Sequence, residues 1–192
     1  MRATRSGQPA HLLLDIVECL DTLRIPYMVI GAFAISYHGV PRATNDSDAA
    51  IWLHGTGTTE TELGKRISEA GFHVEIKRGD IEDPILGVVT VQDRFGNMLD
   101  LILGIRGMDP AAAERAVETS LLDARVRIAG MEDLIAMKLF AGGVQDLEDV
   151  RGILQVASDS LNLALVRSLA DRYCVTTQRK FEVLFAELPD QH

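Results

Sequence analysis

Apolar residues in the first half of the chain recur first at helical spacing and then in short strand-like runs. Leu12, Ile16 and Leu20 lie on one face of a predicted amphipathic helix over 10–24, which ends before Pro26. The next apolar run ends at a glycine, which is typical of a buried strand. Strands are predicted at 27–30, 47–53, 72–76, 88–91 and 98–103, and helices at 32–37 and 58–70.

The pattern changes near Gly104, after which helical spacing dominates. The Asp109-Pro110 pair is a good helix opening and predicts a helix over 109–118. One last short strand is predicted at 126–128, and further helices at 131–140, 146–157, 160–172 and 176–187. This order predicts an α/β (α+β) fold, with a small mixed β-sheet, flanking helices and a C-terminal helical bundle. We expect an α/β region over 1–105 and a helical region over 106–192, packed as one compact body.

The formal charge of −9, from 19 basic and 28 acidic residues, limits the classes of partner. Such a surface repels polyanions on average, which argues against a broad DNA-binding surface but allows a local basic pocket. Cys19 and Cys174 match no metal-ligand spacing and are expected to be reduced thiols. Asp15 and Glu18 interrupt the first apolar run, which therefore predicts neither a signal peptide nor a membrane span. A cytoplasmic protein is expected.

Three aspartates stand out because of where they interrupt predicted strands. Asp46 and Asp48 are two residues apart, so both side chains point to the same face of their strand. Asp100 lies inside the apolar run 98–103, where an unpaired charge is expensive to bury. On neighbouring strands, three such carboxylates can hold two divalent cations that stabilise an in-line phosphoryl displacement. The cation is expected to be Mg²⁺, with Mn²⁺ as the alternative.

Each aspartate also has a purely structural explanation. Asp46 can be a turn residue after Thr44, Asp48 can lie on a solvent-exposed face, and Asp100 can pair with an arginine such as Arg42. For any one of these aspartates taken by itself, the structural explanation is favoured over a metal site. The three aspartates together, following a glycine turn, favour a metal site.

The order of these motifs resembles the nucleotidyltransferase superfamily, which has the DNA polymerase β-like fold. The shared elements are a strand that ends at a glycine turn, a short helix, an Asp-x-Asp strand and a later strand with a third acid. A narrower similarity, to the bacterial branch that contains AbiEii-type toxins, extends over 27–155. The matching residues are Gly31-Ala32, Ala34, His38-Gly39, Arg42, Thr44, Asp46, Asp48, Asp100, Lys138, Asp146 and Asp149.

The resemblance implies roles for these residues. The region 1–105 is then the catalytic core, in which the three aspartates bind metal and Asp100 helps to deprotonate the acceptor hydroxyl. Gly31 and Ala32 are expected to bring the backbone close to the nucleotide phosphates. The other implied nucleotide-binding residues are Arg42, Thr44, Lys138, Asp146 and Asp149.

Several of these residues have ordinary alternatives. Arg42 can form a surface ion pair, and Lys138 can extend from its apolar helix to solvent. Asp146 can be an N-cap, with Asp149 favouring the same helix N-terminus. His38, next to Gly39, can lie near the nucleotide, although a lone histidine is more often structural.

The resemblance implies transfer of a nucleoside monophosphate from an NTP to a hydroxyl, with release of pyrophosphate. The acceptor can be an RNA 3′ end such as that of tRNA, a protein side chain or a small molecule. The alternative is a degenerate domain that binds only a nucleotide, or a cognate protein in a toxin–antitoxin pair. Ala32 favours this alternative, because the family usually has glycine or serine there. A metal-dependent phosphohydrolase that uses the same carboxylates is a third hypothesis.

Overall fold

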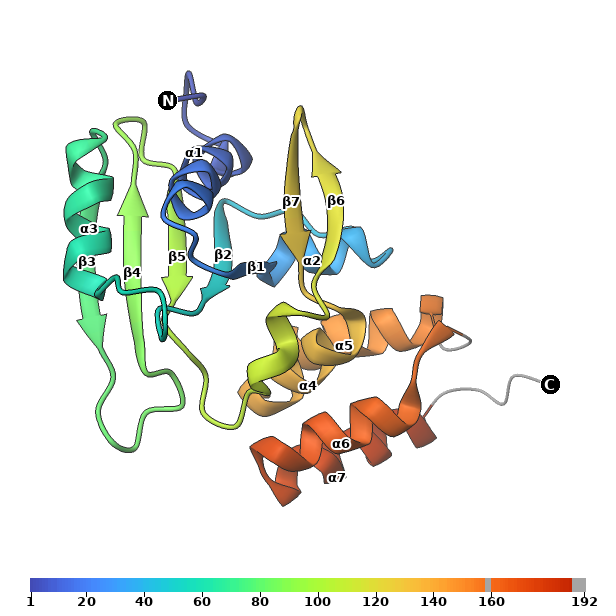
Figure 1. Cartoon of the computed structure of the whole chain (residues 1–192). Helices are drawn as coiled ribbons and strands as arrows, with labels where there is room; N and C mark the ends of the chain where they lie inside the picture. The colour runs from blue at the N-terminus through green and yellow to red at the C-terminus, as the bar shows by residue number, and fades with distance from the viewer. Residues whose placement is uncertain (158–159, 188–192) are drawn as a thin grey trace.

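Seven strands form one mixed sheet in the order β3-β4-β5-β2-β1-β7-β6 (Figure 1). The computed structural model describes residues 1–157 and 160–187, so residues 158–159 and 188–192 of the predicted helical region lie outside the described part. The strands are β1 (Tyr27–Ile30), β2 (Asp46–Ile51), β3 (His73–Arg78), β4 (Gly87–Gln92), β5 (Met98–Ile102), β6 (Val117–Leu121) and β7 (Ala124–Ile128). The helices are α1 (Pro9–Thr22), α2 (Gly31–Tyr37), α3 (Glu60–Glu69), α4 (Met131–Ala141), α5 (Val144–Ala157), α6 (Leu163–Tyr173) and α7 (Val175–Ala186).

The mixed sheet and its flanking helices confirm the predicted fold class. The pairs β2–β5 and β1–β7 are parallel, whereas the pairs β1–β2, β3–β4, β4–β5 and β6–β7 are antiparallel. The helices α4 to α7 gather into one group, apart from α1 and α3 (Figure 1). The sheet itself runs past residue 105, because β7 pairs with β1. The division at 105 stays a prediction.

The face of the sheet that α1 covers decides where the polar side chains of β2 can lie. Ser47 is buried in β2, and its hydroxyl donates to the carbonyl oxygen of Pro9 in α1 at 3.4 Å. Side chains alternate along a strand, so Ser47, Ala49 and Ile51 face α1. Asp46 and Asp48 therefore lie on the opposite face.

The predicted helix over 109–118 is wrong beyond its first turn. Residues Pro110–Ala113 form a short 3-10 helix, capped by the side chain of Asp109, and the chain then enters β6. The missed strand β6 forms a hairpin with β7 around the two-residue turn Leu122-Asp123. An alanine-rich start favours a helix locally, but pairing with β7 satisfies the backbone of residues 117–121.

The helix α4 is apolar almost all round because it packs among the other C-terminal helices. Leu134, Ile135, Met137 and Leu139 are buried, and α4 contacts α5, α6 and α7. None of the helices in the described residues is both long enough and apolar enough to cross a bilayer.

Candidate functional site

The strand register brings Asp46, Asp48 and Asp100 to one face of the sheet. In the parallel pair β2–β5, Asp48 lies directly opposite Asp100, and Asp46 lies opposite Met98. Residues that are directly opposite in a pleated sheet point to the same side. All three carboxylates therefore lie on the face opposite α1.

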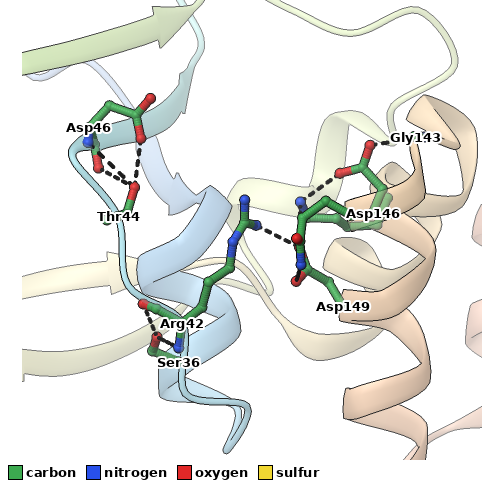
Figure 2. A network of polar contacts seen from close by, with 9 residues as sticks. Ser36, Arg42, Thr44, Asp46, Gly143, Asp146 and Asp149 are labelled. Atoms are coloured by element: carbon green, nitrogen blue, oxygen red, sulfur yellow. Dashed lines mark hydrogen bonds and ion pairs between the residues drawn. The ribbon is translucent and has the colours of Figure 1, made fainter.

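Two of the three carboxylates are held by threonine hydroxyls. The Thr44 hydroxyl donates to Asp46 Oδ1 at 2.6 Å and also lies 3.0 Å from the Asp46 carbonyl oxygen (Figure 2). The Thr90 hydroxyl donates to Asp100 Oδ1 at 2.7 Å. Across residues 1–157 and 160–187, no three His, Cys, Asp or Glu side chains are already grouped for a metal ion. The aspartates share a face, but they are not assembled into a ligand set.

Among the carboxylates in the described part of the chain, Asp48 has the pKa that departs most from its ordinary value. Burial, helped by the negative charges of Asp46 and Asp100, raises the pKa of Asp48 from 3.8 to about 6. Lys138 and Arg42 lower the pKa of Asp48 but do not cancel these effects. Four charged groups, those of Asp46, Asp100, Lys138 and Arg42, thus act on the pKa of Asp48. A cation placed there would relieve the repulsion among the carboxylates.

Gly31 lies against Asp48 because Ile30, at the end of β1, pairs with Asp48 across the sheet. Its φ is +63°, in the left-handed region that favours glycine. A Cβ atom on residue 31 would lie 2.1 Å from Asp48 Oδ2. The sharp turn from β1 into α2 thus needs glycine for both its backbone conformation and its lack of a side chain.

Replacing Gly31 with alanine is expected to destabilise the protein by about 2–4 kcal/mol, because backbone strain adds to the collision with Asp48. The matched control is Gly57→Ala: Gly57 has φ +75°, and a Cβ atom placed on it would meet no neighbour within 4 Å. The control should lose only about 1 kcal/mol, which is the cost of the left-handed backbone. Urea unfolding measures both changes. Equal losses of stability in the two variants would mean that glycine is needed at position 31 only for its backbone conformation and not for its lack of a side chain.

Two positively charged side chains near the aspartates, those of Lys138 and Arg42, are held by two acidic residues of α5. Lys138 Nζ lies 2.7 Å from Asp146 Oδ1 and 2.9 Å from Asp149 Oδ2, and Arg42 donates to Asp149 Oδ2 at 2.6 Å. Figure 2 shows Arg42 and Asp149 pointing toward each other from the loop after α2 and from α5. The side chain of Asp149 is only 2% exposed. Gln145, which the sequence did not single out, donates to Asp149 Oδ1 at 3.1 Å.

These contacts decide several open alternatives. Arg42 pairs with Asp149, so the hypothesis that Arg42 pairs with Asp100 is wrong. Lys138 does not extend to solvent: its side chain is 12% exposed. Asp146 is the third residue of α5 and not its N-cap, because the helix begins at Val144. Its carboxylate reaches back to accept the Gly143 N–H at 3.1 Å (Figure 2).

Ala32 and His38, which also match the family pattern, are held by contacts within the fold. Ala32 is buried in the first turn of α2. A ring nitrogen of His38 lies 2.8 Å from the Ala129 carbonyl oxygen, which ties α2 to the end of β7. Its hydrogen bond gives His38 the structural role that was expected.

Thr90 is the contact of Asp100 that the sequence analysis missed, although a signal was available. The strands β4 and β5 form a hairpin around residues 93–97, and counting outward from that turn pairs Thr90 with Asp100. Identifying the two strands as a hairpin would have predicted the pair.

A pocket of about 230 Å³ opens beside Asp48. Its polar lining consists of Asp48, Lys138 and Asp146, and Gly31 forms part of its wall. The remaining lining residues are apolar. The pocket therefore connects the glycine turn and the charged cluster to an apolar space.

No protein-family model and no curated protein matches the sequence. Solved structures nevertheless match over most of the chain. An antigenic nucleotidyltransferase-like protein from Paracoccidioides brasiliensis is 16% identical with a TM-score of 0.54, over 96% of this chain and 95% of that chain. The antibiotic-resistance factor ANT(2'')-Ia, studied in solution, is 16% identical with a TM-score of 0.60, over 91% and 94% of the two chains.

A third similar structure is the lincosamide antibiotic adenylyltransferase LnuA with lincomycin bound. It is 13% identical with a TM-score of 0.50, over 80% of this chain and 99% of that chain. Identities this low carry information about the fold and none about the substrate. The sheet order, the flanking helices and these structural matches together show that this chain has the nucleotidyltransferase-like fold.

Proposed function

We propose that this protein is a Mg²⁺-dependent nucleotidyltransferase, which moves a nucleoside monophosphate from an NTP to an acceptor hydroxyl and releases pyrophosphate. The observation that carries the proposal is the register of β2 and β5, in which Asp48 lies opposite Asp100 and Asp46 shares their face. Gly31, at the turn into α2, lies against this cluster. Phosphoryl transfer depends mainly on positioning and on neutralising charge, and acids beside phosphate-binding groups can supply both.

The donor set suits a hard divalent cation. Asp46, Asp48 and Asp100 offer carboxylate oxygens, which Mg²⁺ and Mn²⁺ prefer. Burial of Asp48 and its repulsion by Asp46 and Asp100, which together raise the pKa of Asp48, are a cost that a bound cation offsets. Thr44 and Thr90 each donate to Oδ1, and the second oxygen of each carboxylate could bind the cation. When bound, the metal would neutralise charge on the transferring phosphoryl group.

The protein's own groups divide the remaining work. Asp100 is the candidate base for the acceptor hydroxyl. Arg42 and Lys138 neutralise phosphate charge, and the backbone at Gly31 and Ala32 approaches the phosphates.

The roles of Asp146, Asp149 and Thr44 follow from their contacts. In this proposal, Asp146 and Asp149 position the side chains of Lys138 and Arg42, and the nucleotide-binding role that the resemblance implied for the two acids stays a prediction. Thr44 orients Asp46 through its hydroxyl.

By fold-level analogy alone, we propose a small-molecule hydroxyl as the acceptor. One neighbour, ANT(2'')-Ia, was solved with adenylyl-2''-tobramycin, and LnuA was solved with lincomycin. The net charge of −9 adds weight against a long RNA-docking surface. An RNA 3′ end and a protein side chain stay alternative acceptors, and membership of the AbiEii-type branch stays a prediction.

A second candidate function is nucleotide or partner binding without catalysis. Two observations favour it: Ala32 replaces the usual glycine or serine, and the described carboxylates are not grouped in advance for a metal. The protein would then act as one half of a pair with a cognate protein.

Isothermal titration with an NTP, with and without Mg²⁺, separates the two functions. The proposed enzyme binds in a metal-dependent way, and the Asp46→Ala/Asp48→Ala variant loses this dependence. Incubation with α- and γ-labelled NTP and a panel of hydroxyl acceptors then identifies the product. Released pyrophosphate supports transfer, whereas free phosphate indicates a phosphohydrolase. Metal-independent binding would favour the non-catalytic alternative.

A further inference from the structure

The pocket beside Asp48 forms a slot that has two apolar walls. One wall comes from the sheet side and consists of Ile85, Ile102 and Ile105. The other wall is one face of α4, formed by Leu134, Met137 and Ala141 at helical spacing. An isolated antiparallel β-bridge between the backbones of Ile85 and Ile105 holds the first wall together.

The charged groups of the slot all belong to the proposed phosphate site. Lys138 pairs with Asp146 and is close enough to Asp48 to lower the pKa of that carboxyl. The lining therefore joins a charged part to an apolar part in one pocket of about 230 Å³. An NTP has the same division, since its triphosphate is charged and its base is a flat, weakly polar ring.

The apolar walls present little that could read the hydrogen-bonding edge of a base. Their six side chains carry no nitrogen or oxygen. The backbone around the sheet-side wall is already paired: the Arg106 N–H donates to the Pro84 carbonyl at 2.9 Å, and the Met108 N–H donates to the Ile105 carbonyl at 3.1 Å. The Leu86 N–H donates to the Gly104 carbonyl at 2.9 Å. On the other wall, the backbone belongs to the interior of α4.

We infer that this slot, resting on the proposed function, receives the purine base of the NTP and recognises it by shape and apolar contact alone, so that adenine and guanine are accepted almost equally. An apolar pocket discriminates similar ligands by only about 10- to 200-fold, whereas hydrogen-bonded readout reaches about 10⁴-fold. A purine covers more apolar area than a pyrimidine, so purine nucleotides bind more tightly.

The base is a better occupant of the slot than the acceptor. In an in-line displacement, the acceptor oxygen and the leaving pyrophosphate lie on opposite sides of the α-phosphorus. Gly31 and Lys138, which are proposed to contact the leaving phosphates, line the slot. The acceptor therefore approaches from the other side.

Calorimetric titration in Mg²⁺ buffer tests the inference with four probes: ATP, GTP, CTP and inorganic tripolyphosphate. The slot predicts ATP and GTP affinities within about tenfold of each other. Both should exceed the affinity for tripolyphosphate by about tenfold or more, with CTP between. A preference of about 1,000-fold for one purine would overturn the inference, because it would require a polar group that forms hydrogen bonds with the base.

The variant Ile105→Trp fills the slot and should bring the ATP affinity down to that of tripolyphosphate, while tripolyphosphate binding itself is retained. The control Ile81→Trp adds the same ring to a side chain of the β3–β4 loop that is 88% exposed and outside the slot, and should change neither affinity. Thermal unfolding checks that both variants are folded. If Ile105→Trp disturbs folding, Met137→Ala is the substitute, and it should weaken ATP several-fold but not tripolyphosphate.

The outcomes separate the two proposals. Unchanged ATP binding in a folded Ile105→Trp variant would overturn the inference that the slot binds the base, but not the proposed nucleotidyltransferase activity. Failure of all four probes to bind the wild-type protein would overturn the proposed function, and the slot's role with it.

Discussion

Replacing Asp48 with asparagine is expected to lower nucleotidyl transfer by about 10³-fold or more and, at the same time, to make the metal-free protein more stable above pH 6. The loss follows from the proposed role of Asp48 as a metal ligand. The gain follows from its surroundings, because its negative charge is buried beside Asp46 and Asp100. A function that depends on clustered charge is thus paired with a local loss of stability.

The sign of the pH dependence follows from the two pKa values of Asp48. The pKa is about 6 in the folded protein and 3.8 for the ordinary group, so between these values the folded state binds more protons. Stability from Asp48 therefore falls as pH rises from about 4 to 6, and the full cost is present above pH 6. Two pKa units correspond to at most about 3 kcal/mol, and relaxation should reduce the cost to about 1–2 kcal/mol.

Urea unfolding of wild type and Asp48→Asn at about pH 8 and about pH 4 measures this difference. The variant should be more stable at the higher pH only. Asp123→Asn, in the exposed turn between β6 and β7, removes the same charge elsewhere and should change stability little at either pH. Mg²⁺ should stabilise the wild type more than Asp48→Asn. A variant that is no more stable than wild type at about pH 8 would show that burial beside Asp46 and Asp100 does not disfavour the charged form of Asp48.

Replacing Asp149 with asparagine is expected to destabilise the protein by about 2–4 kcal/mol and to lower kcat/KM for the NTP by about 10- to 100-fold. The buried carboxylate of Asp149 accepts from Arg42 and forms an ion pair with Lys138, and these two residues come from different parts of the chain. Asparagine leaves Lys138 with Asp146 as its ionic partner and frees the Arg42 guanidinium. The two side chains that are proposed to bind phosphate, those of Arg42 and Lys138, then lose their fixed positions.

A kinetic comparison distinguishes this positioning role from a general loss of folding. At a temperature where the variant is fully folded, Asp149→Asn should raise KM for the NTP more than it lowers kcat, because the cations contact phosphates in the ground state as well. Asp149→Glu should restore part of the loss. Glu148→Gln, next to Asp149 but in an exposed pair with Arg151, should behave as wild type. Equal KM values for wild type and Asp149→Asn would argue against positioning.

Local patterns were enough to predict most elements and the fold class. Apolar spacing located α1 and the strands β1, β4 and β5 to within a few residues, because their buried faces repeat at the periods of a helix or a strand. The pattern failed at 114–121, where alanines after Asp109-Pro110 favour a helix but a hairpin partner decides the structure. Strand pairing is a contact across the chain and leaves a weak local trace.

For the candidate site, the sequence alone determined which residue types were present, at what spacing, and that Asp46 and Asp48 share a face. Only the tertiary structure decided that Asp48 lies opposite Asp100, that Gly31 presses against Asp48, and that Asp149 holds both Arg42 and Lys138. The physical reason is that periodicity orients a side chain on its own element. The charge that a side chain meets depends instead on how separate elements pack together.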